Sequence, residues 1–185
     1  MAKSQNVPMK TLTLHIKILV SPVGITIRQM MTAMNNLFSQ ANIFVNLISR
    51  EELELSDNKS EFFNELDVGS CNVRPTDEQR DLARIRDNID GAVVVVYICN
   101  ILIGESTIYD GCSTHPAGVP MAVIRRLASP FTLAHEIGHL LGLKHCSERH
   151  RDNIMHPDPP LIVPGVWLRD HQIDEMRQSP LLTEN

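Results

Sequence analysis

The sequence has no block of like charges and no long apolar run. Its 22 acidic and 17 basic residues give a net charge of -5 and are spread along the chain, which leaves no basic stripe for nucleic acid or an anionic membrane. The longest apolar run, from Ala92 to Gly104, is interrupted by Asn100 and is too short to cross a bilayer. We therefore expect no nucleic-acid partner and no membrane span.

The N-terminal residues also lack the apolar core of a signal peptide. A strand pattern already begins near Thr11, so any signal or activation segment would have to lie outside this chain, and secretion or export stays open. At 185 residues, the chain fits one domain that can bury about two thirds of its unfolded surface. We expect a soluble domain whose compartment the sequence does not reveal.

Cysteine is scarce, and no C-x-x-C pair occurs. The cysteines are Cys71, Cys99, Cys112 and Cys146, which are even in number and widely spaced. They permit two disulfides in any of three connectivities, and they equally permit buried free thiols. The sequence leaves both possibilities open.

Strand and helix patterns follow one another along the chain. Alternating apolar residues from Leu12 to Val20 predict a half-buried strand with His15 on its solvated face. An apolar stripe at three- and four-residue steps predicts a helix from Ile27 to Ala41. Further patterns predict a strand over 43–48, an exposed charged loop over 51–60, a short surface helix from a Thr76–Gln79 capping box to about Asn88, a central strand over 92–99 covered on both faces, a strand over 121–127, and a helix opened by Ser129 and Pro130.

The last of these helices carries the string HEIGHLLGLKH, residues 135–145. On a helix, the four-residue step from His135 to His139 places both imidazoles on one face, within reach of one ion. Gly142 can take the left-handed conformation that ends a helix, which lets His145 turn back to the same ion. Three imidazoles leave one position of a tetrahedral site open, as in catalytic zinc sites. We therefore predict one catalytic Zn²⁺ held by His135, His139 and His145.

Glu136 projects beside the two helical ligands. Zinc lowers the pKa of its bound water from about 15.7 to about 7 and polarises a substrate carbonyl. Glu136 can take the proton of that water and later deliver it to the leaving amine. The alternative is an amphipathic helix with satisfied histidines, but five fixed residues at this spacing arise by chance in about one such sequence in ten thousand. The pattern indicates hydrolysis with Glu136 as general base and acid.

The full motif HExxHxxGxxH and the later string Asn153-Ile154-Met155-His156-Pro157 resemble the metzincin clan of zinc peptidases and its Met-turn. The resemblance implies an α+β fold, in which a twisted mixed sheet, a backing helix and the zinc-site helix precede a small C-terminal lobe with a terminal helix near 170–178. It also implies one catalytic domain over residues 1–185, with an upper lobe of about 1–142, a lower lobe of about 143–185 and the active-site cleft between them.

The same resemblance implies a zinc endopeptidase that acts on a peptide or protein in extended conformation. An edge strand within 105–120 would form the upper rim of the cleft and pair with the substrate. Met155 would lie beneath the metal as an apolar floor. His156 and Pro157 would help to form the pocket for the residue after the scissile bond, with the wall of the pocket continuing to Val166.

The subfamily is less well defined. The string HEIGHLLGLKH and the Met-x-Pro pattern look like matrixins, although Cys146 stands where matrixins carry serine, and the tyrosine that follows the turn in astacins and serralysins is absent. The pair His145-Cys146 is similar to archaemetzincins, but the cysteines of their second metal site do not follow, so we expect one zinc only. We interpret His115 and His150 as surface histidines.

Two other functions remain open. The chain could be the peptidase domain of a delivered toxin or effector, or a noncatalytic interaction domain that zinc stabilises. The intact Glu136 argues against the second, because a structural site gains nothing from a base and usually has four protein ligands. Cys71 lies inside the domain rather than ahead of it, which argues against a thiolate that blocks the zinc.

Overall fold

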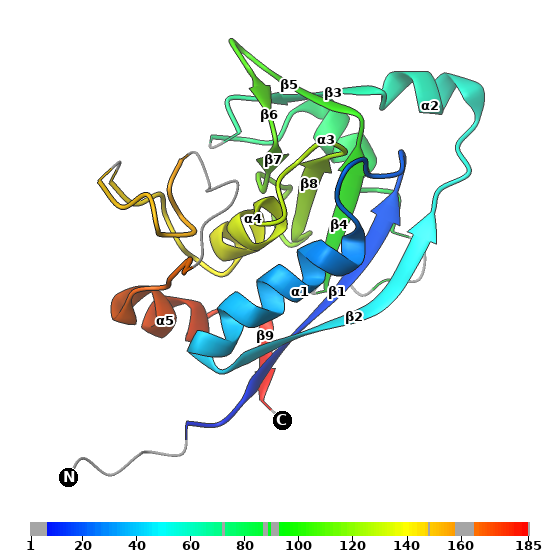
Figure 1. Ribbon diagram of the computed structural model, residues 1–185. Coiled ribbons are helices and arrows are strands. Elements are labelled where there is room, and N and C mark those ends of the chain that lie inside the picture. Colours follow the sequence, from blue (N-terminus) through cyan, green and yellow to red (C-terminus); the bar gives the residue numbers. More distant parts are fainter. Residues whose placement is uncertain are drawn as a thin grey trace, which may run out of the picture.

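The computed structural model describes residues 7–71, 73–86, 89, 93–147, 149–157 and 165–184 (Figure 1). In chain order the elements are β1 (Lys10–Ile18), α1 (Ile27–Phe38), η1 (Ser39–Ala41), β2 (Ile43–Glu52), α2 (Asp57–Phe62), β3 (Glu65–Gly69), α3 (Asp77–Leu82), β4 (Val94–Cys99), β5 (Ile101–Gly104), β6 (Ile108–Tyr109), β7 (Gly111–Cys112), β8 (Met121–Arg125), α4 (Thr132–Leu140), α5 (Asp170–Arg177) and β9 (Leu182–Glu184). Among these described elements, no helix has both the length and the apolar character that crossing a bilayer requires.

The main sheet is mixed and has the strand order β2-β1-β4-β8-β7, with β9 paired to β1. Strands β2, β1, β4 and β8 run parallel to one another, whereas β7 is antiparallel to β8 and β9 is antiparallel to β1. A smaller sheet has the order β3-β5-β6. The predicted α+β class with a mixed sheet is confirmed, and β7 is the edge strand expected within 105–120.

Both faces of the main sheet are covered. Val94, Val96 and Ile98 of β4 belong to the core that α1 and α4 complete, and Figure 1 shows these two helices side by side over the sheet. The alternate residues Val95, Tyr97 and Cys99 belong to a second core with β3, β5 and α3. Parallel strands with two covered faces are apolar on both. The central strand predicted from the run of valines is therefore confirmed from Val94 onward, while Ala92 lies outside the described residues.

The α1 helix backs the sheet as its apolar stripe predicts. Thr26 and Gln29 form a capping box at its start, and the 3₁₀ turn η1 continues it to Ala41. Met30, Met34 and Phe38 are fully buried on the sheet-facing side. Each such side chain stabilises the fold by about 1.5–3 kcal/mol through apolar burial.

The charged stretch over 51–60 is mostly exposed, as expected, but within it only residues 53–56 form a loop. β2 extends to Glu52, and Asp57–Phe62 forms the short helix α2, whose first turn carries Asp57. A carboxylate near a helix N-terminus is favourable, because the helix dipole is positive there. The loop was predicted too long because the second half of β2 is exposed and shows little alternation, and because α2 has only six residues.

The helix that opens at Thr76 has the predicted capping box with Gln79, but it ends at Leu82. The expected end near Asn88 lies outside the described residues. Strands β3, β5 and β6 have no counterpart in the sequence prediction. Each is two to five residues long, which is too short for a period to be recognised.

The C-terminal part contains the helix predicted near 170–178, which is α5. Beyond it, the chain returns to the main sheet as β9, antiparallel to β1, and this strand was not predicted. The side chain of Gln40 joins the C-terminal part to the end of α1 and η1. Its amide donates to the carbonyl of Val166, and its oxygen accepts from the N–H of Leu168.

The cysteines adopt both of the states that the sequence permits. Cys71 and Cys112 form a disulfide that joins the segment after β3 to β7. Cys99 and Cys146 are free, and burial raises the pKa of the Cys99 thiol to about 12. In the disulfide, Cys71 has no thiolate with which to block a metal.

Candidate metal centre

The helix α4 carries two of the expected ligands. It begins at Thr132, three residues after the predicted start, and the Ser129 hydroxyl accepts from the N–H of Phe131 just before the first turn. From Thr132 to Gly138 every residue is buried, because α4 lies between the sheet, α1 and the C-terminal part. A helix buried on nearly all sides holds its polar side chains in fixed positions.

The helix ends as Gly142 predicts. Gly142 has a φ of 108°, a conformation that L side chains rarely adopt. Its N–H donates to the carbonyl of His139, and the N–H of Leu143 donates to the carbonyl of Gly138. This pair of bonds is the Schellman arrangement, which satisfies the last helical carbonyls and reverses the chain. The reversal brings His145 back toward the helix.

The three histidines meet at one point. The Nε2 atoms of His135 and His145 are 3.2 Å apart, and the Nε2 atom of His139 lies 3.1 Å from each of the other two. Nitrogen ligands at about 2.0–2.1 Å from a tetrahedral zinc lie about 3.3 Å from one another. The donor set and its spacing therefore fit one zinc ion. His145 is exposed, so the site opens to solvent on that side.

Backbone carbonyls orient two of the rings. The Nδ1 atom of His135 lies 2.7 Å from the carbonyl oxygen of Ile154, and that of His139 lies 2.8 Å from the carbonyl oxygen of Leu143. Each Nδ1–H donates to its carbonyl, which leaves the lone pair of Nε2 free for a metal. Neither carbonyl could be identified from the sequence, because both contacts depend on how the chain turns after the helix.

The protonation of the cluster also favours metal binding. Burial and, to a smaller extent, the neighbouring His139 lower the pKa of His135 to about 3, against a raising effect of the Ile154 carbonyl. Burial is the largest cause of the lowered pKa of His139 and of His145 as well. All three rings are therefore neutral at neutral pH, as metal ligands must be.

Met155 lies in a turn that packs against α4. It is fully buried, and its N–H donates to the Asn153 side chain while its carbonyl accepts from the N–H of Cys146. The amide groups of Asn153 and Gln172 donate to each other, so α5 holds the turn from the other side. These bonds fix the direction of the Ile154 carbonyl, which contacts His135.

Gly138 makes room for the Met155 side chain. A Cβ atom at position 138 would lie 2.7 Å from the Met155 sulfur. Alanine stabilises an exposed helix by about 0.8–1.0 kcal/mol relative to glycine. We expect the opposite sign here: Gly138→Ala should lower the free energy of unfolding by about 1–3 kcal/mol, the usual range for overpacking. Urea unfolding of the zinc-loaded protein measures it.

The double variant Gly138→Ala/Met155→Ala provides the control for this prediction. With the sulfur removed, the added methyl group has space, so Gly138→Ala should cost much less stability in the Met155→Ala background. Equal losses in both backgrounds would show that the contact with Met155 is not the cause.

Glu136 is buried beside the cluster. Only 6% of its surface is exposed, and its side chain lies against Gly111 of β7. Burial raises the pKa of Glu136 to about 8, while a hydrogen bond with the Ser113 side chain acts in the opposite direction. A pKa near neutrality suits a group that both accepts and donates a proton. The sequence predicted Glu136 but gave no sign of Gly111 or Ser113.

The other predicted site residues have different environments. His156 is buried and close enough to His135 and His145 to lower their pKa values, whereas Pro157 is exposed. Residues 158–164, most of the expected pocket wall, lie outside the described residues. Within the part of the chain that the structure describes, no second group of His, Cys, Asp or Glu side chains could hold an ion, so His115 and His150 form no such site.

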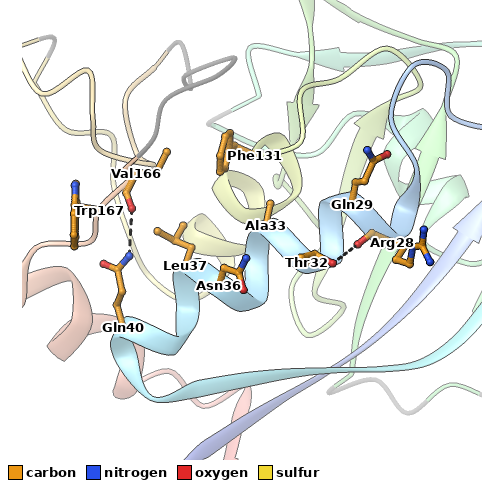
Figure 2. A pocket seen from close by; sticks show the side chains of 11 residues that line it. Arg28, Gln29, Thr32, Ala33, Asn36, Leu37, Gln40, Phe131, Val166 and Trp167 are labelled. Carbon is orange, nitrogen blue, oxygen red and sulfur yellow. Dashed lines mark hydrogen bonds between the residues drawn. The ribbon is translucent and has the colours of Figure 1, made fainter.

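A separate groove of about 530 Å³ lies on the outer face of α1. Figure 2 shows Trp167 and Val166 at one end of it and Arg28 at the other, with Phe131 between them. None of the groove's lining residues has a His, Cys, Asp or Glu side chain. The groove therefore takes no part in the metal centre.

Solved structures identify the fold. No family model matches the sequence, and no curated protein matches it. The chain is similar to metalloproteinase-II from Bacteroides fragilis, with a TM-score of 0.63 and 17% identity over 96% of this chain and 55% of that one. It is also similar to archaemetzincin from Methanopyrus kandleri, with a TM-score of 0.59 and 15% identity over 91% of this chain and 94% of that one.

This chain spans about half the length of the first of these structures. The chain has the α+β fold of these metzincin-type structures, and it carries a three-histidine cluster that begins on α4. The resemblance inferred from the sequence is therefore confirmed at the level of the fold.

Proposed function

We propose that the chain is a zinc-dependent metalloendopeptidase. The observation that supports this best is the convergence of three histidine Nε2 atoms, 3.1–3.2 Å apart, beside the buried carboxyl group of Glu136. Three imidazoles with one open side are typical of catalytic zinc, because structural zinc is usually enclosed by four protein ligands. The metzincin fold is consistent with the same reaction.

Each part of the cluster has a separate task. His135 and His139 would hold one zinc ion from the helix, and His145 would hold it from the loop that follows. The carbonyls of Ile154 and Leu143 keep the first two rings in the orientation that binding requires. When bound, zinc supplies a Lewis acid that polarises a peptide carbonyl and lowers the pKa of water.

Glu136 would move the proton. Its carboxylate accepts a proton from the attacking water and then delivers that proton to the nitrogen of the leaving amine. Burial against β7 excludes competing solvent from the carboxyl group and fixes its position. The buried position would therefore slow exchange of the transferred proton with bulk water between the two steps.

The substrate would be a peptide in extended conformation. Because β7 is the last strand in the order of the described sheet, a peptide could add beside it through backbone hydrogen bonds. Met155 would be the Met-turn residue beneath the metal, and His156 and Pro157 would contribute to the pocket after the scissile bond. In this proposal residues 1–185 form one catalytic domain, with the cleft between an upper lobe of about 1–142 and a lower lobe of about 143–185.

The test is a metal and cleavage analysis of the purified protein. We expect about one zinc per chain by elemental analysis and cleavage of interior bonds in a peptide library, with the products identified by mass spectrometry. A chelator should abolish cleavage, and added zinc should restore it. Absence of cleavage with zinc bound would contradict the proposal and favour a noncatalytic zinc-stabilised module.

A further inference from the structure

Gly111 contacts the Glu136 side chain so closely that no larger residue fits. A Cβ atom at position 111 would lie 2.6 Å from the Cγ, 2.7 Å from the Oε1 and 2.9 Å from the Cδ of Glu136. The backbone itself does not require glycine, since Gly111 is not among the glycines with positive φ. The Glu136 side chain is therefore what excludes a side chain at position 111.

Residues on either side of Cys112 face the same carboxyl group. β7 ends at Cys112, and Ser113 follows it directly. The Ser113 side chain forms a hydrogen bond with the Glu136 carboxyl group. Cys112, between them, is buried in the second core and bonded to Cys71. Gly111 and Ser113 therefore contact Glu136, while Cys112 between them is held in the second core.

Several bonds hold this stretch in place. Before Gly111, Asp110 forms an ion pair of 2.7 Å with Arg125, and its carbonyl accepts from the N–H of Arg125. After Gly111, the Cys71–Cys112 disulfide and a 2.6 Å hydrogen bond from the Thr114 hydroxyl to the Cys71 carbonyl fix the chain. A methyl group added at Gly111 would therefore displace the Glu136 side chain rather than the strand.

We infer that Gly111 and Ser113 form a seat for the carboxyl group of Glu136, and that Gly111 is a positioning residue for proton transfer. This inference rests on the proposed function, because Gly111 can affect proton transfer only if Glu136 is the general base and acid. A base acts only within hydrogen-bond reach of the proton it takes. Since a misplacement of about 1 Å can lower a rate about 10²-fold, the seat controls the turnover rate.

The test is a steady-state analysis of Gly111→Ala in the zinc-loaded protein. We expect kcat to fall about 10²-fold while KM stays within about twofold and the zinc content stays unchanged, since neither the β7 backbone nor the ligands change. The matched control is Gly118→Ala in the same segment. Gly118 has a φ of 73° and nothing within 4 Å of its Cβ position, so alanine there adds backbone strain without touching Glu136 and should leave kcat unchanged.

A shorter acid provides the rescue. In Glu136→Asp the carboxyl group is withdrawn by one methylene, so Gly111→Ala should cause a much smaller loss of kcat in that background than in the wild type. If Gly111→Ala does not fold, Ser113→Ala tests the same seat. This variant removes the hydrogen bond to the Glu136 carboxyl group, so we expect kcat to fall about tenfold. Thermal unfolding gives a readout apart from activity: Gly111→Ala should lower Tm in the wild type and not in Glu136→Ala.

The outcomes separate the two proposals. A wild-type kcat in Gly111→Ala, or equal losses in the wild type and in Glu136→Asp, would overturn the seat while the peptidase proposal stands. An inactive wild type with zinc bound would overturn the peptidase proposal, and with it the role of the seat, whereas the Tm coupling between positions 111 and 136 would remain as a packing contact.

Discussion

Replacement of Glu136 by alanine is expected to lower kcat about 10²- to 10⁴-fold, the range that general acid–base groups contribute. The zinc content should stay at about one ion per chain, because the three imidazoles and the carbonyls that orient them are untouched. Cleavage of a fluorogenic peptide, selected from the library products, measures kcat, and elemental analysis measures the metal.

Stability separates loss of chemistry from loss of fold in this variant. Glu136 is buried, and a buried carboxyl group is costly to ionise, so its removal should not lower Tm. Glu136→Asp serves as the matched control, since it keeps the carboxyl group but moves it and should retain partial activity. Full activity in Glu136→Ala would exclude Glu136 as the base.

The second large effect concerns zinc and stability. His145→Ala should remove most of the zinc and, with it, most of the stabilisation that zinc confers on the folded chain. At a free zinc concentration 1,000 times the Kd, that stabilisation is about 4 kcal/mol. His145 is the informative ligand, because it is exposed and its removal leaves the metal-free fold nearly unchanged, unlike the buried His135.

Thermal unfolding with and without a chelator measures this effect. The chelator should lower the Tm of the wild type by many degrees and leave that of His145→Ala almost unchanged. His150→Ala is the matched control, because His150 lies in the same segment but outside the cluster, and this variant should behave as the wild type. An equal chelator effect on His145→Ala would show that His145 is not a ligand.

The convergence of the three histidines could be predicted from the sequence because its determinants are local. The step from His135 to His139 is set by the helical period, and the return of His145 is set by the freedom of Gly142 to take a φ of 108°. Apolar periods likewise predicted α1 and the central strand β4. Both α1 and β4 are long enough for the repeat of apolar residues to be recognised in the sequence.

The features that sequence reasoning missed depend on distant contacts. Lys17 alternates with the apolar residues of β1, as His15 does, yet it is 2% exposed and forms an ion pair of 2.6 Å with Glu51. The strand β9 pairs with β1 from the opposite end of the chain. The space for a side chain at position 111 is taken by Glu136, which lies 25 positions later in the sequence, so no local pattern shows why Gly111 is a glycine.

The reciprocal amide pair of Asn153 and Gln172 has a consequence for the whole C-terminal part. Both residues are buried, and the pair holds the turn whose Ile154 carbonyl orients His135. An ion bound to the histidine cluster would therefore couple metal uptake to the docking of α5. A change that loosens α5 would weaken metal binding, and loss of the ion would in turn weaken the docking of α5.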